Sequence, residues 1–474
     1  MLSSRAPLPA LSPAKRDQVR LRLERALGPS KVLTERDPCE RYGADESEAE
    51  PRTPDAVVLA TCVDDIVAAL AVAREADVPI TPRGGGTGRT GGAVPVAGGI
   101  VLATHGMSQI KEIDRAEGIA VVEPGVVLGD LHAAVEAEGW FYPPDPNSWE
   151  TCAIGGNVAE NAGGPRAFKY GVTRQYVLGL QALLIGGQRL QVGRRTLKGV
   201  TGYDVTALLV GSEGTLAVFG DITLRLIPKP PAVMTLLALF GDVRESARAV
   251  ARMTETGLVP RCIELLDGRT LEAMRRSGNA IDARAGAMLL MDVDGELQAC
   301  EAQASRVADA CKGALDVLVA QDASQREKLW SARREMSLSV RRLAKHKLAE
   351  DVVVGRQRVV ELLDRVDAIS EKNRIETLTY GHAGDGNLHV NFLWNDDDEV
   401  PRVDACIEQL FRAVVELGGT LSGEHGIGVL KAPYLGIEQS DELIALQRGL
   451  KRVFDEKGLL NPGKVFPKLG HGAC

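Results

Sequence analysis

The sequence predicts an α+β protein of two domains, and three observations support this prediction. Its 474 residues exceed the length that one hydrophobic core usually serves. Short strand-like runs, amphipathic helical stretches and glycine-rich loops are mixed along the chain. The proline-rich sequence PKPPA, residues 228–232, interrupts both regular structures and therefore marks a domain boundary.

The first predicted element is a charged helix within an N-terminal region, residues 1–34. Ser12 suits its N-cap, Pro13 its first position, and the helix runs to Leu27. The first domain, 35–230, opens with a strand, an amphipathic helix and a second strand: DAVVLA, VDDIVAALAVAREADV and PITPR. Further strands follow between glycine-rich loops.

The second domain, 231–420, mixes strands and helices in a pattern typical of an α+β domain. Its predicted strands are VMTLLALF, IELLD and GAMLLMDVDG, and its predicted helices are DVRESARAVARMTETG and LQACEAQASRVADACKG. No internal repeat and no low-complexity segment interrupts this pattern.

Composition excludes several classes of function. Hydrophobic residues make up 45% of the chain and charged residues 25%, which is ordinary for a soluble globular protein. The net charge of -8 gives no general attraction to nucleic acid or to an anionic membrane. No apolar run approaches the ~18 residues that span a bilayer, and the first residues lack the apolar stretch of a signal peptide. We therefore expect a cytoplasmic protein.

Eight cysteines occur, at irregular spacing and without a C-x-x-C pair. An iron–sulfur cluster, a cysteine-ligated zinc ion and a disulfide framework are therefore not expected. If the chain performs redox chemistry, its electrons must pass to a group outside it.

The glycine-rich sequence PRGGGTGRTGG, residues 82–92, contains G-x-G-x-x-G at Gly86, Gly88 and Gly91. In a Rossmann unit the last glycine opens a helix, but here the chain continues as AVPVAGGIVLAT, which predicts a strand. What remains is a loop of unhindered backbone N–H groups beside Arg83, suited to hold a pyrophosphate. The alternative is a plain glycine-rich turn.

Two more glycine-rich segments follow, at 142–174 and 211–219. The first contains Asn157 and Asn161 among its glycines, and the second is GSEGTLAVF. Three such clusters in one α/β segment fit a large ligand lined by backbone.

The sequence YGHAGDGNLHVN, residues 380–391, holds two of the seven histidines, His382 and His389. Residues seven apart on a straight strand face opposite sides, but the turn at 384–386 allows both imidazoles to converge. Glu424 and His425, in SGEHGIG, offer further partners. Two imidazoles and a carboxylate suit a divalent metal with open positions, whereas the spacing excludes the H-E-x-x-H peptidase motif. A proton relay and two unrelated polar residues in a turn remain alternatives.

These motifs occur in an order that closely resembles the FAD-dependent D-2-hydroxy-acid dehydrogenases, namely glycolate oxidase catalytic subunits, cytochrome-linked D-lactate dehydrogenases and D-2-hydroxyglutarate dehydrogenases. The resemblance extends from about residue 35 to 467 and includes TGYDVT and NPGKVFP. It implies a vanillyl-alcohol-oxidase-type FAD-binding domain of the PCMH type over 35–230. It also implies a substrate-binding cap domain with an antiparallel sheet over 231–420, and a partly helical C-terminal segment, 421–474, that returns to the FAD domain.

The resemblance implies which residues contact FAD. Because the first glycine loop contains no histidine, we expect the FAD to be non-covalent. The implied cofactor-binding residues are Pro82, Arg83, Gly84, Gly85, Gly86, Thr87, Gly88, Gly91, Pro144, Asp145, Ser148, Gly155, Gly156, Asn157, Asn161, Gly163, Gly164, Glu213, Gly214, Thr215 and Asn461.

The resemblance also implies the catalytic groups. His382, His389 and Glu424 would bind zinc, or manganese or iron, and His425 would be the base. Arg333, in the sequence WSAR, would clamp the substrate carboxylate. The chemistry agrees with these residue types, since a metal acidifies the substrate hydroxyl, an imidazole accepts its proton and flavin takes the hydride.

Ala349 occupies a position where some relatives carry a lysine, which favours glycolate or D-lactate over D-2-hydroxyglutarate as substrate; Lys347 is the alternative source of that positive charge. The expected electron acceptor is an iron–sulfur partner subunit, a quinone or a cytochrome, and a partner could hold the protein at the inner face of the membrane. A homodimer is compatible with the sequence, and nucleic acid is not an expected partner. The remaining histidines, at 105, 132, 346 and 471, are interpreted as packing or surface residues.

Two rival functions remain. A metal-dependent hydrolase that uses the same histidines would be colourless. A flavin subunit that only relays electrons would be yellow, but no hydroxy acid alone would reduce it.

Overall fold

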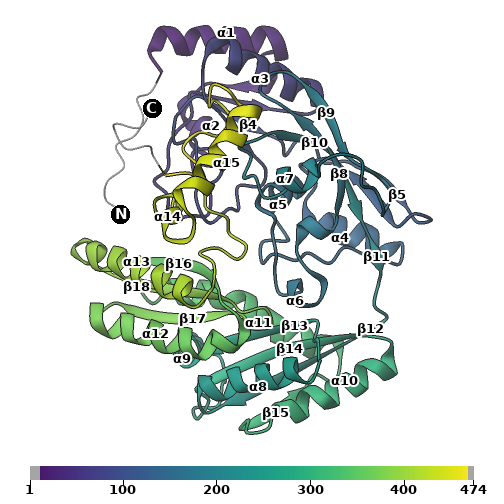
Figure 1. Ribbon diagram of the computed structural model, residues 1–474, viewed down its shortest axis with the longest axis vertical. Coiled ribbons are helices and arrows are strands. Elements are labelled where there is room, and N and C mark those ends of the chain that lie inside the picture. The colour runs from purple at the N-terminus through teal and green to yellow at the C-terminus, as the bar shows by residue number, and fades with distance from the viewer. Residues whose placement is uncertain (1–10, 468–474) are drawn as a thin grey trace. The chain divides into compact units, whose positions relative to one another are not determined.

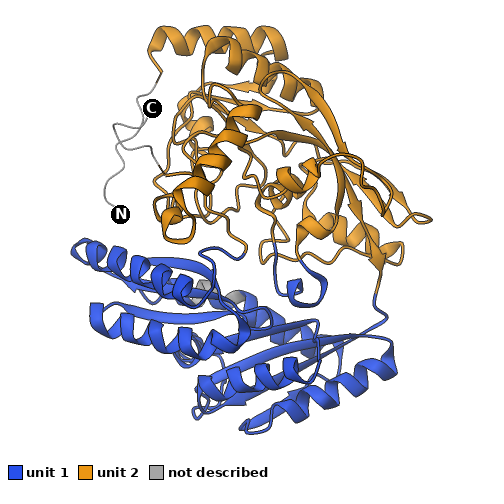
Figure 2. Ribbon diagram, viewed as in Figure 1, with its two compact units in different colours: residues 1–5, 163–171, 230–423 blue, residues 6–162, 172–229, 424–474 orange. Residues whose placement is uncertain are grey.

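The computed structural model describes residues 11–467 and divides them into two compact units (Figure 2). Unit 1 contains 163–171 and 230–423, and unit 2 contains 11–162, 172–229 and 424–467. The start of the chain, on which the expectation about a signal peptide depends, and His471 lie outside the described residues. Within the described chain, no helix has both the length and the apolar character needed to cross a bilayer.

Unit 2 begins with a four-stranded sheet in the order β1 (Val32–Leu33), β2 (Ala56–Leu59), β4 (Ile100–Ala103) and β3 (Ile80–Arg83). The last three strands are parallel. Helices α1 (Pro13–Leu27) and α3 (Val63–Ala76) share a hydrophobic core with this sheet, which includes Leu23 and Leu70. The N-cap of α1 is Ser12, as the sequence predicts.

The second sheet of unit 2 is antiparallel and five-stranded. Its order is β5 (Ile110–Asp114), β6 (Ile119–Val122), β10 (Val218–Arg225), β8 (Val177–Leu183) and β9 (Arg189–Gly193). Strands β7 (Trp140–Phe141) and β11 (Ile227–Pro228) form a separate two-stranded antiparallel sheet. The remaining helices of unit 2 are α2 (Arg36–Glu40), α4 (Leu128–Ala137), α5 (Ile154–Glu160), α7 (Val205–Leu209), α14 (Leu435–Glu438) and α15 (Asp441–Phe454), with 3-10 turns at Pro29–Lys31, Thr173–Gln175 and Ala432–Tyr434.

Unit 1 is built on one seven-stranded antiparallel sheet. Its order is β15 (Asp316–Val319), β12 (Ala232–Phe240), β14 (Ala287–Gly295), β13 (Cys262–Asp267), β17 (Glu376–His382), β18 (Asn387–Trp394) and β16 (His346–Val353). The helices of this unit are α6 (Ala167–Tyr170), α8 (Val243–Glu255), α9 (Gly268–Arg276), α10 (Leu297–Ala310), α11 (Ala323–Arg341), α12 (Val359–Asn373) and α13 (Val400–Glu416), with 3-10 turns at Arg356–Arg358 and Asp397–Glu399.

The two faces of this sheet are covered by different helices (Figure 1). On one face, α9 and α11 share a core cluster with the strands, in which Met274 and Met336 pack against Leu266 and Leu378. Helices α8, α10, α12 and α13 pack on the other face. The face under α11 is the one that carries the candidate site.

Both units combine helices and sheets, so the α+β prediction is confirmed. The chain passes between the units at residues 229–230, within the predicted boundary PKPPA, and again after Gly423, where the sequence analysis places the change at 421. The sequence predicts 163–171 as part of the first domain, whereas these residues belong to unit 1. Tyr170 donates a hydrogen bond to Asp294 at 2.8 Å, and Lys169 forms an ion pair with the same carboxylate.

Candidate active site

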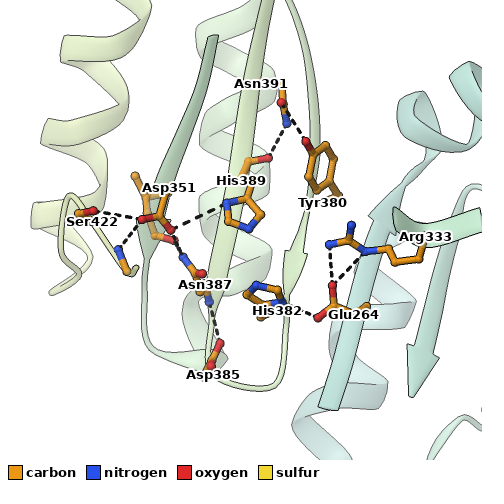
Figure 3. Close-up of polar contacts among 12 residues, drawn as sticks. Glu264, Arg333, Asp351, Tyr380, His382, Asp385, Asn387, His389, Asn391 and Ser422 are labelled. Carbon is orange, nitrogen blue, oxygen red and sulfur yellow. Dashed lines mark hydrogen bonds and ion pairs between the residues drawn. The ribbon is translucent and has the colours of Figure 1, made fainter. Parts of the chain in front are cut away.

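Strands β17 and β18 form a hairpin that brings the two predicted histidines together. His382 is the register partner of Asn387, and Tyr380 is the partner of His389. Cross-strand partners share a face, so all four side chains lie on one side of the sheet. The two imidazole centroids are 5.3 Å apart, with the rings nearly perpendicular (Figure 3). The predicted convergence is therefore confirmed, whereas the role of the rings as ligands remains a prediction.

The turn between the strands requires glycine. Gly386 has a φ of +82°, and a Cβ there would overlap the carbonyl oxygen of Val354. This left-handed conformation is accessible to glycine at little cost. The turn returns the chain so that residues seven apart face the same side.

Glu264 connects one histidine to the arginine of the site and is not among the residues predicted from the sequence. It lies on β13 as the register partner of His382 and is fully buried. One carboxylate oxygen lies 2.5 Å from His382 Nδ1, and the other accepts hydrogen bonds from Arg333 Nε at 3.0 Å and Nη2 at 2.6 Å (Figure 3). Its only sequence signal is an acidic residue between apolar neighbours in the interior of the strand CIELLD.

The charge of Glu264 is stabilised by its two partners. Burial opposes ionisation of this carboxyl, but the charges and hydrogen bonds of His382 and Arg333 outweigh burial and hold its pKa below the usual range. The carboxylate also favours a hydrogen on Nδ1 of His382, because this nitrogen faces an acceptor.

Arg333 differs from the other arginines of its stretch. Arg341 and Arg342 are exposed and Arg334 forms an ion pair with Glu327, whereas Arg333 is buried. Its guanidinium carbon lies 5.2 Å from the centre of the Tyr380 ring. The sequence pattern does not distinguish Arg333 from the neighbouring arginines, whereas its burial in the structure does.

Lys347 and Trp330 lie on the same side of the sheet as the histidines. Lys347 Nζ lies 3.2 Å from the Tyr380 hydroxyl oxygen. Trp330, three residues before the buried arginine, donates its indole N–H to Asp292 at 3.1 Å. Two cationic side chains, Arg333 and Lys347, thus lie near the Tyr380 ring.

Asp351 organises the other edge of the site. Its carboxylate accepts hydrogen bonds from Asn387 at 2.5 Å, Ser422 at 3.1 Å and the Gly423 N–H at 2.9 Å. It is the register partner of His389, whose Nδ1 lies 3.9 Å from it. The end of unit 1 is therefore fixed beside the second histidine.

Glu424 and His425, the other predicted site residues, begin the last segment of unit 2. The turn that contains them is held by two groups of that unit. Thr90 donates its hydroxyl to the His425 carbonyl at 3.0 Å, and Glu213 accepts the N–H groups of Ile427 and Gly428 at 2.8 and 2.6 Å. This turn therefore has a defined backbone conformation within unit 2.

The first glycine loop does not form a Rossmann unit. Strand β3 ends at Arg83, no helix begins in residues 84–99, and the parallel strand β4 follows. Gly86 and Gly91 have φ values of +73° and +82°. A Cβ at Gly85 would lie only 2.7 Å from the carbonyl oxygen of Thr151, so this loop lies against the second glycine-rich segment.

The cradle that these loops form fits a flavin nucleotide. The amide nitrogen of Asn157 and the hydroxyl of Ser212 are buried without a hydrogen-bond partner among the described residues. Buried polar atoms are rarely left so, and a polar ligand would satisfy them. A Cβ at Gly156 would meet nothing within 4 Å, which leaves room above the backbone.

Other predicted cofactor residues have defined positions. The amide of Asn461 donates to the Gly92 carbonyl at 3.1 Å and the Glu213 carbonyl at 2.8 Å, which joins the C-terminal segment to two glycine loops. Arg83 donates to the Ala44 carbonyl at 2.6 Å, and burial lowers its pKa. Gly163 and Gly164 lie in unit 1, whereas the remaining predicted residues, Pro82, Gly84, Thr87, Gly88, Pro144, Asp145, Ser148, Gly155, Asn161, Gly214 and Thr215, lie in unit 2.

The remaining described histidines, at 105, 132 and 346, contact residues other than His382 and His389. His105 stacks on Tyr42, His132 Nε2 lies 3.0 Å from the Pro144 carbonyl oxygen, and His346 stacks on Trp394. The described cysteines form no disulfide with one another.

Comparison with known proteins identifies related chains over most of the sequence. The family model "FAD binding domain" matches residues 54–193, and the model "FAD linked oxidases, C-terminal domain" matches 229–465. Glycolate oxidase subunit GlcD of Bacillus subtilis is 39% identical, covering 90% of this chain and 92% of its own. D-lactate dehydrogenase of Archaeoglobus fulgidus is 36% identical (93% and 98% covered), and D-2-hydroxyglutarate dehydrogenase of Stutzerimonas stutzeri is 31% identical (96% and 99%).

A solved structure shows the same fold. The 4-ethylphenol oxidase of Gulosibacter chungangensis superposes with a TM-score of 0.79 at 17% identity, covering 98% of this chain and 99% of its own. At this identity the likeness shows the fold alone. The predicted vanillyl-alcohol-oxidase-type FAD-binding fold is confirmed.

Proposed function

The chain belongs to the FAD-linked oxidases, and from this membership we propose that it oxidises a small D-2-hydroxy acid to the 2-oxo acid. Relatives in this oxidoreductase family are named for glycolate, D-lactate and D-2-hydroxyglutarate. Glycolate or D-lactate is the favoured substrate. The observation that carries the proposal is the hairpin in which His382 and His389 converge beside the buried pair of Glu264 and Arg333. Buried charged residues of this kind are not needed to form the sheet, which supports a role for them in catalysis.

We propose His382, His389 and Glu424 as ligands of a divalent metal, zinc or manganese or iron. Glu264 engages Nδ1 of His382 and leaves Nε2 for coordination. Glu424 directly follows Gly423, whose N–H donates a hydrogen bond to Asp351, the register partner of His389. This covalent link supports Glu424 as the third ligand. Two imidazoles and a carboxylate are a donor set that such ions accept. When bound, the ion would lower the pKa of a chelated substrate hydroxyl.

The chain's own residues then orient the substrate and move its proton. Arg333 attracts the substrate carboxylate while Glu264 fixes its guanidinium plane. His425, next to the proposed ligand Glu424, accepts the hydroxyl proton. Non-covalent FAD, held by the glycine loops and by Asn461, supplies the hydride acceptor.

The substrate preference rests on Ala349. This residue is the register partner of Asn391, and it lies on the face that also carries Asp351 and Lys347. A methyl group at this position cannot pair with a second carboxylate, which supports a monocarboxylic substrate. D-2-hydroxyglutarate is the second candidate.

We propose that the electrons leave to an iron–sulfur partner subunit, a quinone or a cytochrome. The relative from Bacillus subtilis is named as a subunit, which supports a partner protein. The proposed location is the cytoplasm, or the inner face of the membrane through that partner. A homodimer remains compatible with this proposal.

The visible spectrum of the purified protein tests the proposal. The protein should show flavin bands, and glycolate or D-lactate should bleach them without oxygen, whereas L-lactate should not. A colourless protein that also fails to take up FAD would refute it and favour the hydrolase. Flavin that only a protein partner reduces would indicate the relay subunit.

The metal is tested separately. His389→Ala, or removal of the metal by chelation, should abolish bleaching while FAD stays bound. His105→Ala is the control, because His105 is exposed and stacks on Tyr42 in unit 2. Full activity of the His389→Ala protein would remove the metal from the mechanism.

A further inference from the structure

The turn after His425 is held by a carboxylate rather than by backbone alone. Glu213 is buried, and its two oxygens each accept one N–H, from Ile427 at 2.8 Å and from Gly428 at 2.6 Å. Two adjacent N–H groups on one carboxylate fix two successive peptide planes. Charge-assisted hydrogen bonds of this kind are stronger than neutral ones.

The backbone of Glu213 is itself in an uncommon conformation. Its φ is +52°, a left-handed value that non-glycine residues seldom adopt. The surroundings hold it there, since its N–H donates to the Ala159 carbonyl and its own carbonyl accepts from Asn461, each at 2.8 Å. Such strain concentrates at functional sites.

The turn is packed tightly against this carboxylate. A Cβ added at Gly426 would lie 3.0 Å from a Glu213 oxygen and would overlap a Glu160 oxygen. A Cβ at Gly428 would overlap the Thr90 carbonyl oxygen. Both glycines have positive φ, at +77° and +51°. A side chain at either glycine would therefore not fit beside Glu213, Glu160 and Thr90.

A second carboxyl group, that of Glu160, lies beside the first at the end of α5. Burial and then the neighbouring charge of Glu213 raise its pKa well above the usual value, and one of its oxygens is buried with no hydrogen-bond partner in the described chain. Burial raises the pKa of Glu213 too, but its two N–H donors oppose this. The two N–H donors therefore favour the charged form of Glu213, whereas nothing comparable opposes the effect of burial at Glu160.

We propose that Glu213 is a positioning residue whose side chain holds the 426–428 turn, so that His425 and Glu424 are presented in one orientation. In this proposal the side chain of Glu213 hydrogen-bonds to the turn, and only its backbone is available to contact FAD. This inference rests on the proposed function, which names His425 as the base.

The test compares two substitutions in the full-length, FAD-loaded protein. Glu213→Gln keeps the volume of the side chain, but its NH₂ group would face one of the two backbone N–H groups, so one hydrogen bond to Ile427 or Gly428 is lost. Glu123→Gln is the matched control, since Glu123 is also buried in unit 2, accepts the Gln109 N–H at 3.0 Å and pairs with Lys111. Glu213→Gln should retain FAD, and its limiting rate of flavin reduction by glycolate or D-lactate should fall about 10- to 100-fold, with little change in the half-saturating concentration. Glu123→Gln should keep the wild-type rate.

Hydrogen exchange of the peptide covering residues 424–430 provides a readout that needs no activity. The Ile427 and Gly428 amides should exchange faster in Glu213→Gln than in wild type or Glu123→Gln. Unchanged exchange together with an unchanged rate would overturn the inference, and loss of FAD would instead make Glu213 a cofactor residue. If Glu213→Gln does not fold, Glu213→Asp, which is too short to reach both N–H groups, should show the same losses.

These readouts separate the two proposals. Fast exchange in Glu213→Gln, in a protein that no hydroxy acid reduces, would support the positioning contact and refute the proposed function. Reduction of both variants at the wild-type rate would refute the positioning role and leave the proposed function standing.

Discussion

The substitution Glu264→Gln tests the contact that joins His382 to Arg333. The glutamine keeps the volume of the side chain and removes its charge. Its single carbonyl oxygen can serve either the guanidinium or the imidazole, and its NH₂ group then faces the other. The change is therefore confined to the pairing within unit 1.

The cost follows from burial. The side chains of Arg333 and Glu264 are only 10% and 0% exposed, so solvent does not screen the pair appreciably. Removing one partner of a buried ion pair costs about 3–5 kcal/mol. For a unit of this size, such a loss lowers the melting temperature by roughly 6–20 °C. Loss of the acceptor for His382 Nδ1 also frees the ring to rotate, which should slow flavin reduction about 10- to 100-fold.

Calorimetry and anaerobic stopped-flow reduction measure the two effects on one sample. Asp267→Asn is the control, three residues further along the same region. Its carboxylate accepts the N–H groups of Thr270 at 2.8 Å and Thr379 at 2.6 Å, outside the histidine and arginine contacts. This control should melt earlier than wild type and reduce its flavin at the wild-type rate.

Two results would refute the reasoning. A Glu264→Gln protein that melts like wild type would show that the buried pair contributes little to unit 1. A protein that melts earlier but reduces its flavin at the wild-type rate would show that Glu264 stabilises the unit without orienting His382.

Three further predictions concern other residues. Because the folded-state pKa of Glu160 is raised, the wild-type protein loses stability as the pH rises above the unfolded-state pKa of about 4.3. Glu160→Gln removes this loss, so the variant should have a higher melting temperature than wild type at pH 7 but not near pH 3. Equal shifts of the melting temperature at both pH values in calorimetry would contradict this prediction. Ala349→Lys should raise the rate with D-2-hydroxyglutarate relative to D-lactate by about 10-fold or more, because a buried charged hydrogen bond is added, and an unchanged ratio of reduction rates would refute the assignment. A Cβ at Gly423 would lie 2.7 Å from a Val353 methyl group, so Gly423→Ala should slow flavin reduction without loss of FAD, whereas Gly436→Ala, where a Cβ meets nothing within 4 Å, should not.

Local sequence signals predicted several elements because their causes are local. Ser12 and Pro13 are an N-cap and a first helical residue whatever the rest of the chain does. Pro95 and the glycine pair at 98–99 oppose a helix after the first glycine loop, and the β-branched run of β4 favours a strand, without any tertiary information. The hairpin of β17 and β18 follows from glycines between two strand-like runs. These predictions needed only neighbouring residues.

The contacts of the site are not local, and the sequence pattern did not reveal them. Glu264 lies 118 residues from His382 and 69 from Arg333, and strands β13 and β17 and helix α11 must assemble before they meet. Strand periodicity assigns Glu264 to a face but does not name its partner. The transfer of 163–171 to unit 1 has the same cause, because Tyr170 and its partner Asp294 are 124 residues apart.

The position of the charged group in unit 1 is an argument for function in itself. Glu264, Arg333 and His382 lie on the sheet face whose neighbouring positions, such as Leu266 and Leu290, are apolar and packed in one core cluster. Well-packed apolar side chains in place of a buried ion pair are often neutral or stabilising by about 1–4 kcal/mol. A sheet that needed only stability would therefore gain from apolar residues at these positions. The charges make sense as chemistry, since an imidazole held in one tautomer and a guanidinium held in one plane suit the oxidation of a 2-hydroxy acid that we propose.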